Sequence, residues 1–260
     1  MSRSEQTREM TGRIDLNSDL GESGGGRVFD DAAVLPSISS ANVACGFHAG
    51  EPGGIRLTCR RAAELGVTVG AHPGYRDFEG FGRRFMDVDL SELTDEVIYQ
   101  IGAVQAVARS VGTEVRYVKP HGGLYNAIAV REDQARAVTR AILELDDSLP
   151  LMVLPGSVIE RVARDSGLRT VSEAFADRGY LPDGTLVRRG LPGALLAPEA
   201  AVAQALRIAT EGRIVAHDGT EIAIAADSIC LHGDDPAAVR LARDIRAALE
   251  GAGVSIRSFA

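Results

Sequence analysis

Short β-branched runs alternate with longer amphipathic stretches along nearly the whole chain of 260 residues, and this alternation limits the possible folds more than any other feature. The runs that predict strands are Ile14–Leu20, Ser37–Cys45, Val67–His72, Val115–His121, Leu151–Pro155, Thr170–Phe175, Ser228–His232 and Val254–Arg257. Helical patterns lie between them at 53–65, 91–112, 131–145 and 235–253, and Ser91 and Gly112 are plausible ends of the second. Seven or eight such units predict an α/β fold, a single TIM-like β/α barrel that is seven-stranded or irregular. A doubly wound open sheet is the alternative.

Two segments interrupt this rhythm without forming a second domain. The stretch "RGYLPDGTLVRRGLPGALLAP" (178–198) carries turn signals and predicts an excursion from the barrel. The stretch "RIVAHDGTEIAIA" (213–225) predicts a hairpin closed at Asp218-Gly219. We therefore expect one barrel domain over residues 13–260, preceded by a disordered tail at residues 1–12.

The charge balance and the apolar runs argue against several classes of protein. The net charge is −8, whereas nucleic-acid binding normally requires a basic face. No apolar run approaches the length of a membrane span, and the polar start of the chain shows no secretory signal. Three cysteines without a C-x-x-C pair fit a reducing compartment. We expect a cytoplasmic protein that binds neither nucleic acid nor membrane, and association of its copies into a homo-oligomer stays open.

The first predicted strand carries polar side chains on one face. Asp15, Asn17 and Asp19 recur at period two, so they share a face, while the apolar residues between them share the other. In a barrel the apolar face packs on helices, so the polar face points inward, where carboxylates need partners. Glu22 and the glycines at 24–26 follow as a loop that could hold an anion, although a run of glycines is weak support by itself.

Four of the five histidines lie at or just beyond the C-terminal end of a predicted strand, and only His217 lies in the hairpin. A lone histidine at a strand end is usually structural. Four histidines from different strands of one parallel barrel would converge on the rim where barrel active sites lie. The four candidates are His48, His72, His121 and His232.

Lys119 is the only lysine among 28 basic residues, and it lies two positions before His121, so the two side chains are expected to face one cavity. A compact ammonium is not equivalent to the planar fork of arginine, which could explain why this lysine is kept. Zinc binding through Cys45 and Cys230 is disfavoured, because no close pair of ligands surrounds them and small cysteines fill tight strand ends.

A divalent metal is a further alternative that the sequence leaves open. It would be held by His48, His72 and one of Asp15 or Asp19, as in carboxylate-and-imidazole hydrolase sites.

Two loops supply further candidates. Arg83 and Arg84 could bind a substrate carboxylate or could form a solvated surface pair. Asp177 and Arg178 either serve the pocket or form a loop salt bridge of little energetic consequence. The chain contains no P-loop, no G-x-G-x-x-G after a strand and no G-x-S-x-G, so it shows neither a familiar nucleotide cradle nor a serine-hydrolase nucleophile.

Six motifs in a fixed order resemble the LamB/YcsF family: "DLNSDLGE", "SANVACGFHAGEP", "GAHPGYRDFEGFGRR", "VKPHGGLYN", "EAFADRGY" and "CLHGDDP". The resemblance runs from about Asp15 to the C-terminus. It implies a β/α barrel related to polysaccharide deacetylases, of the glycoside hydrolase/deacetylase type. It also implies a role beside partner subunits B and C in an ATP-hydrolysing 5-oxoprolinase, which opens 5-oxoproline to L-glutamate while ATP becomes ADP and phosphate.

Hydrolysis of such a lactam would need a base for water, cations near the carbonyl oxygen and an anchor for the ring carboxylate. Our hypothesis is that Asp19 or His72 is the base and that Lys119 and His121 stabilise the developing charge. An arginine would hold the carboxylate, and the remaining candidates would bind substrate. These substrate-binding candidates are Asp15, Asn17, Glu22, His48, Arg83, Arg84, Asp177, Arg178 and His232.

Two other classes of function stay open at this stage. The chain could be a self-sufficient metal-dependent amide hydrolase or deacetylase, which would lose activity to a chelator and need no ATP. It could also be a non-catalytic lactam-binding module, in which substitutions at the barrel rim would alter binding but not turnover.

Overall fold

The computed structural model describes residues 12–188, 190–233 and 236–260. Residues 1–11 of the expected disordered tail lie outside the described residues. Within the described ranges no helix has both the length and the apolar character needed to cross a membrane.

Parallel strands close into a seven-membered ring, which confirms the predicted barrel and makes the open sheet the wrong alternative. The ring closes because β1 pairs with β2 along one edge and with β9 along the other. Its members in spatial order are β1 (Arg13–Leu20), β2 (Ser40–Ala44), β3 (Thr68–His72), β4 (Val115–Val118), β5 (Leu151–Val153), β6 (Thr170–Phe175) and β9 (Ser228–Cys230).

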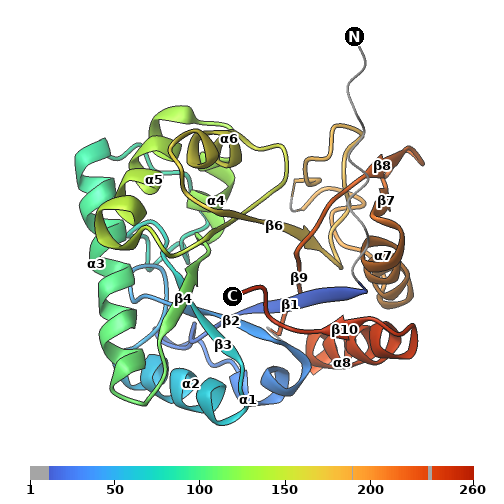
Figure 1. Ribbon diagram of the computed structural model, residues 1–260, viewed down its shortest axis with the longest axis horizontal. Helices are drawn as coiled ribbons and strands as arrows, with labels where there is room; N and C mark the ends of the chain where they lie inside the picture. Colours follow the sequence, from blue (N-terminus) through green and yellow to red (C-terminus); the bar gives the residue numbers. More distant parts are fainter. Residues whose placement is uncertain (1–11, 189, 234–235) are drawn as a thin grey trace.

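The last predicted strand lies beside this ring. β10 (Ser255–Ile256) pairs with Arg13 and Ile14, ahead of the β1 residues that pair with β9. It therefore extends the pairing along one edge of β1 and does not add an eighth strand to the ring. The chain then ends near the middle of the barrel in Figure 1, where Phe259 packs against Tyr117.

Helices surround the ring on its outer side (Figure 1). They are α1 (Asp31–Val34), the 3₁₀ helix η1 (Leu35–Ser37), α2 (Pro52–Glu64), α3 (Leu90–Arg109), α4 (Gly122–Ile128), α5 (Glu132–Asp146), α6 (Val158–Asp165), α7 (Pro198–Glu211) and α8 (Pro236–Gly251). The expected start of α3 at Ser91 is wrong, because Asp89 is the N-cap and accepts from the backbone N–H groups of Ser91 and Glu92.

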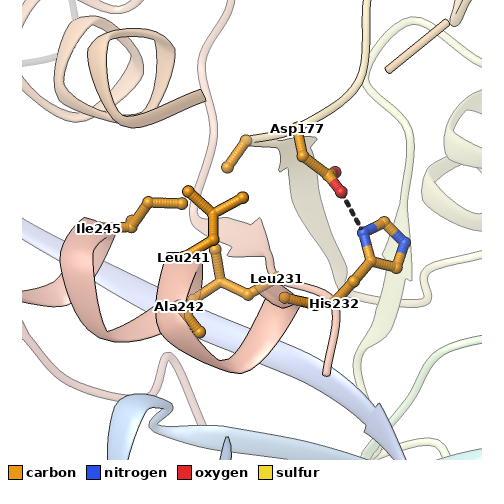
Figure 2. A pocket seen from close by; sticks show the side chains of 8 residues that line it. Asp177, Leu231, His232, Leu241, Ala242 and Ile245 are labelled. Carbon is orange, nitrogen blue, oxygen red and sulfur yellow. Dashed lines mark hydrogen bonds and ion pairs between the residues drawn. The ribbon is translucent and has the colours of Figure 1, made fainter. Parts of the chain in front are cut away.

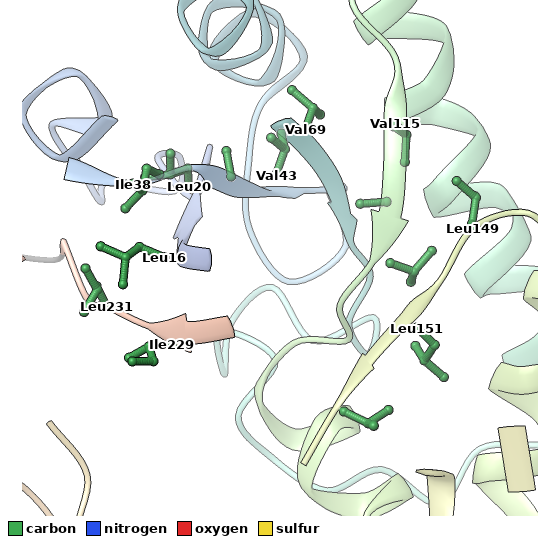
Figure 3. Close-up of a cluster of buried hydrophobic side chains, with 14 of the residues drawn as sticks. Leu16, Leu20, Ile38, Val43, Val69, Val115, Leu149, Leu151, Ile229 and Leu231 are labelled. Carbon is green, nitrogen blue, oxygen red and sulfur yellow. The ribbon is translucent and has the colours of Figure 1, made fainter. Parts of the chain in front are cut away.

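The hydrophobic core lies between the ring and these helices, as Figure 3 shows for the strands on one side. Leu16 and Leu20 of β1 belong to it together with Val43, Val69 and Ile229 from other strands. Because side chains alternate along a strand, burying this apolar set outward turns the polar set of β1 into the barrel. The period-two pattern thus decides what the interior contains.

The two segments that interrupt the rhythm lie where the sequence predicts them. β7 (Arg213–Val215) and β8 (Glu221–Ala223) form the antiparallel hairpin, which lies outside the ring. The excursion after β6 is fixed by Gln204 of α7, whose amide donates to the carbonyls of Phe175, Ala176 and Arg178. Residues of this excursion form one wall of the cavity described next.

Candidate functional site

A cavity of about 660 Å³ opens at the C-terminal ends of the barrel strands. Its size lies within the range of roughly 300–1,000 Å³ that is usual for small-molecule sites. Acidic and imidazole groups lie on its β1, β3 and β4 side, and basic groups come from the loops. The lining residues are Asp19, Glu22, His72, Arg83, Lys119, Pro120, His121, Gly122, Tyr125, Asn126, Phe175, Arg178, Leu186, Val187, Arg188 and His232.

Three of the four predicted rim histidines meet directly. The rings of His48 and His121 stack in parallel with centroids 3.8 Å apart, and His72 meets both rings edge-on. Glu22 reaches into this group, with its Oε1 atom 3.2 Å from His48 Nε2 and 3.2 Å from His121 Nδ1. The strand ends therefore bring together residues that lie far apart in the chain.

The outer nitrogens of two rings are held by backbone carbonyls. His72 Nδ1 lies 2.6 Å from the carbonyl oxygen of Lys119, and His121 Nε2 lies 2.9 Å from that of Phe81. Phe81 has a φ of 55°, a left-handed conformation that is uncommon for a large side chain and that aims its carbonyl at the ring. Because a carbonyl only accepts, both outer nitrogens carry hydrogens, and the inner nitrogens of His72 and His121 face Glu22.

Two glycines let the chain cover the histidines closely. A Cβ atom on Gly82 would lie 2.6 Å from His48 Cβ and 2.9 Å from His121 Cδ2, and one on Gly74 would lie 2.8 Å from His48 Nδ1. Those distances are too short for any larger residue. The glycines of "GAHPGYRDFEGFGRR" are thus needed for close packing on the imidazoles.

Lys119 lies at the centre of the barrel mouth, enclosed by polar groups. Its Nζ atom is 3.0 Å from Asn17 Oδ1, 3.1 Å from Asp19 Oδ1 and 2.8 Å from Glu173 Oε1. Burial alone would lower the pKa of Lys119, but the neighbouring carboxylates, Asp19 first, raise it well above its usual value. The ammonium is therefore charged, and its three hydrogens are directed at barrel residues.

Asp19 is the most accessible acid of the cluster, with 24% of its side chain exposed. Asn42 donates to its Oδ1 atom, and His72 Nε2 lies 3.3 Å from its Oδ2 atom. Burial raises the pKa of Asp19, but His72 and Lys119 outweigh burial and hold it well below the usual value. The same balance raises the pKa of His72, because Asp19 and Glu22 outweigh the effect of burial.

Asp15, a predicted substrate and metal ligand, lies at the other end of β1. Its carboxylate accepts from the hydroxyls of Ser39, Ser40 and Ser228. Burial raises its pKa to about 6, despite the serine hydrogen bonds. Asn17 lies one layer higher, where its Oδ1 atom accepts from Asn42 and Lys119. Neither residue lines the cavity, so their contribution is to hold the residues above them.

His232, the fourth rim histidine, lies across the cavity from the other three. Figure 2 shows its Nδ1 atom paired with Asp177 Oδ2, at 2.6 Å, above the apolar side chains of α8. A small apolar gap of about 20 Å³ lies beneath the pair. Although burial raises the pKa of Asp177, the bond to His232 lowers it below the usual value. This pair faces the cavity as a separate acid–imidazole group.

The candidate arginines occupy different surroundings. Arg83 lines the cavity, whereas Arg84 is largely exposed and forks onto Asp77. Arg178 lines the cavity but also donates to the carbonyls of Ala194 and Val187, which fix the excursion. Arg188 lines the cavity as well and was not predicted. Only Arg84 of the predicted arginines is directed away from the site.

Three further residues at the site were not among the candidates predicted from the sequence. Asn42 faces Asp19 because the two are in register between β1 and β2. Glu173 of β6, two strands along the ring from β4, pairs with Lys119, and Tyr125 of α4 lines the cavity beside Phe175. Asn42 could have been found from its strand parity, and Tyr125 from its place on the helix that follows His121, whereas the contact of Glu173 with Lys119 depends on how β4, β5 and β6 pack into the ring.

Comparisons with known proteins agree with the sequence motifs. The model of the LamB/YcsF family matches residues 14–260. The A subunit of the 5-oxoprolinase of Kocuria rhizophila is 55% identical over 249 residues, covering 95% of this chain and 99% of that one. The corresponding 5-oxoprolinase chain of Paracidovorax citrulli is 57% identical over 249 residues, covering 95% and 99%.

Solved structures show the same fold. The lactam utilization protein of Thermus thermophilus has a TM-score of 0.91 at 47% identity, covering 95% of this chain and 100% of that one. A family 4 carbohydrate esterase from Streptomyces lividans has a TM-score of 0.52 at 14% identity, covering 96% and 94%. The second likeness concerns the fold alone.

Proposed function

The chain belongs to the LamB/YcsF family, and from this premise we propose that it is the lactam-opening subunit of an ATP-dependent 5-oxoprolinase. In this proposal 5-oxoproline becomes L-glutamate while ATP becomes ADP and phosphate, with partner subunits B and C completing the enzyme in the cytoplasm, where ATP is supplied. The observation that carries the proposal is the cavity, because it brings an ionised acid and imidazoles together with arginines from two loops.

The cavity is larger than one five-membered lactam needs, so it has room for a second reactant. Transfer of a phosphoryl group from ATP to the amide oxygen would make the ring carbonyl carbon more electrophilic. Water then adds to that carbon, the ring C–N bond breaks as the nitrogen takes up a proton, and a second water releases phosphate. These steps require a base, positive charge near the oxygen and an anchor for the carboxylate.

We assign these roles from the contacts of each side chain. Asp19 is the base that touches water, because it is ionised and is the most exposed acid of the cluster. His72 and His121 lie beside it and line the cavity, so both rings would lie near the charge that develops on the carbonyl oxygen. Lys119 is a positioning residue in this scheme, because its ammonium already donates to Asn17, Asp19 and Cys230 and forms an ion pair with Glu173.

The carboxylate anchor would come from the loops. Arg83 and Arg188 both line the cavity and could bind the ring carboxylate. Arg84 is left out of the proposal, because its guanidinium is bound to Asp77. His232, with Asp177 behind it, would serve as the proton donor to the departing ring nitrogen from the opposite wall.

The decisive experiment mixes this chain with its proposed partner subunits, 5-oxoproline and ATP, and measures glutamate and phosphate with each component omitted in turn. Asp19→Asn and His121→Ala should each reduce glutamate formation by about 10²–10⁴-fold with the fold intact by circular dichroism. His217→Ala, which removes the exposed hairpin histidine, should leave turnover unchanged. Near-normal turnover of the Asp19 variant would remove that residue from the mechanism.

A second candidate function is favoured by the cluster of Glu22 with three histidines, which resembles the ligand set of a hydrolase metal site. In that case the chain alone would hydrolyse amides or acetyl groups without ATP. Turnover by the isolated chain, lost on adding a chelator, would support this candidate over the first.

A further inference from the structure

Three imidazoles and one carboxylate converge at the floor of the cavity, and we propose that they bind a divalent first-row transition-metal ion. One ligand atom each from Glu22, His48, His72 and His121 lies within 4.8 Å of all the others, and all four residues are buried. Nitrogen and oxygen ligands lie about 2.0–2.2 Å from Zn²⁺, so two ligands of a tetrahedral ion are about 3.3–3.6 Å apart. The four side chains could therefore enclose such an ion after inward shifts of about 1 Å.

The outer contacts of the rings direct lone pairs at this point. His72 and His121 each have one nitrogen at a backbone carbonyl, that of Lys119 and that of Phe81 respectively, and these nitrogens carry the hydrogens. The other nitrogens, His72 Nε2 and His121 Nδ1, then face inward and lie only 2.9 Å apart. Carbonyl acceptors behind ligating imidazoles are the usual support of a protein metal site, because they fix both tautomer and ring orientation.

Protons alone do not satisfy every short contact in the cluster. His121 Nδ1 lies 2.9 Å from His72 Nε2 and 3.2 Å from Glu22 Oε1. A ring nitrogen has one in-plane position, which holds either a lone pair or a hydrogen, so it cannot bond linearly to both neighbours. The stacking of His48 on His121, at 3.8 Å, also disfavours a charge on both rings. One cation at the centre would accept lone pairs from all four residues together.

The ligand types select the class of metal. Three imidazoles with one carboxylate suit Zn²⁺, Co²⁺, Ni²⁺ or Fe²⁺, whereas Mg²⁺ and Ca²⁺ prefer shells made of oxygen. The set differs from the one that the sequence suggested, because Asp15 lies at the far end of β1 and Glu22 and His121 take part instead. His48 Nδ1 has no hydrogen-bond partner among the described residues, so we expect His48 to be the most weakly held ligand.

The position of the site relates it to the reaction without depending on it. Glu22, His72 and His121 line the cavity, so a bound ion would be accessible to reactants and could polarise a carbonyl or a water. Metal binding can be measured on the chain alone, with neither lactam nor ATP present, so its result is independent of the proposed reaction.

The test measures the metal content of the purified chain by mass spectrometry, followed by removal with a chelator and titration with Zn²⁺ and Co²⁺. We expect about one equivalent per chain, a rise in the thermal midpoint on adding Zn²⁺, and visible absorption of the Co²⁺ form typical of nitrogen and oxygen ligands. Glu22→Gln, which keeps the shape of the side chain, and His121→Ala should reduce uptake at least tenfold. His217→Ala is the matched control and should bind as the unaltered chain does.

The unaltered chain alone decides the question if a variant fails to fold. A folded chain that contains no metal and takes up none of these ions would overturn the proposal. The rings and Glu22 would then be joined by hydrogen bonds alone. Stoichiometric metal in a chain that supports no 5-oxoproline turnover would keep this proposal and overturn the previous one. If a metal-free assembly that takes up no ion still converts 5-oxoproline to glutamate, the metal proposal is overturned and the proposed reaction is kept.

Discussion

Asp15 and Asp19 are two aspartates on the same face of the same strand, yet their pKa values shift in opposite directions. They are four residues apart, about 13 Å at the rise of a strand. Burial among three serine hydroxyls raises the pKa of Asp15 to about 6, whereas His72 and Lys119 hold the pKa of Asp19 well below its usual value despite burial. Residue type and spacing predict that both point inward, but the neighbouring strands decide the direction in which each pKa shifts.

This difference predicts an unusual pH dependence of stability for Asp15. Its pKa is higher in the folded chain than in the unfolded one, so its contribution is full below about pH 4 and is lost as pH rises through about 6. A shift of about two units corresponds to roughly 3 kcal/mol. Relative to Asp15→Asn, the unaltered chain should therefore lose about that much unfolding free energy between about pH 4 and pH 7.

Urea unfolding of both proteins across this range measures the difference. Asp183→Asn provides a contrast, because Thr185 lowers the pKa of that exposed turn aspartate and its removal should act in the opposite direction. A difference between the unaltered chain and Asp15→Asn that stays constant with pH would show that Asp15 keeps an ordinary pKa.

At the scale of elements, the loop between β3 and α3 controls the geometry of the histidines. Gly82 and Phe81 both have positive φ angles, of 61° and 55°, and lie directly over the rings of His48 and His121. The aromatic ring of Phe81 meets His121 edge-on, while its carbonyl binds His121 Nε2. The loop therefore orients the imidazoles from above, as the barrel strands do from below.

Gly82→Ala should consequently impair the site more than it impairs the fold. The new Cβ would lie 2.6 Å from His48 Cβ, so the loop or the rings must move, in addition to a cost of about 1–2 kcal/mol for a left-handed alanine. Gly26→Ala has the same backbone cost, at φ 85°, but no atom lies within 4 Å of its Cβ. We expect Gly82→Ala to lose somewhat more thermal stability than Gly26→Ala, and only Gly82→Ala to lose most glutamate formation by the assembled enzyme.

Equal activity of the two glycine variants would show that the rings tolerate displacement. A much lower thermal midpoint for Gly82→Ala than for Gly26→Ala would instead assign the residue a role in the fold as a whole.

The elements also show where prediction from sequence reaches its limit. The strand before Asp19 and those before His72 and His121 were predictable, because β-branched runs and period-two polarity depend on a few neighbouring residues. The pairing of β9 with β1, which closes the ring at seven strands, depends on contacts between residues at opposite ends of the chain. Lys119 could likewise be placed beside His121 from the sequence, whereas its ion pair with Glu173, two strands along the ring, depends on tertiary packing and could not be predicted.

At the scale of the whole molecule, the barrel encloses an acidic interior around one lysine. Asp19 and Glu173 approach the Lys119 ammonium from β1 and β6, and Glu22 faces the histidines nearby. All the other basic residues of these two types are arginines, whose planar group is larger than an ammonium. The Lys119 nitrogen already lies within 3.3 Å of Asn17, Asp19, Glu173 and Cys230. The position of the only lysine is thus explained by the size of the enclosure and by its charge.

Replacing this lysine should therefore be costly in two different ways. Lys119→Met leaves Asp19 and Glu173 without their buried partner and should destabilise the fold by roughly 3–5 kcal/mol. Lys119→Arg keeps the charge but overfills the space, at a cost of about 1–3 kcal/mol. Arg116→Met changes an exposed residue of β4 that pairs with Glu114 at the surface, and it should stay within about 0.5 kcal/mol of the unaltered chain. Urea unfolding at neutral pH measures the unfolding free energy of the three variants. The stability loss of Lys119→Met should become smaller as the pH falls, because protonation of the unpaired carboxylates relieves their repulsion. A Lys119→Met variant as stable as the unaltered chain at neutral pH would mean that the barrel interior does not need this charge to hold its acids together.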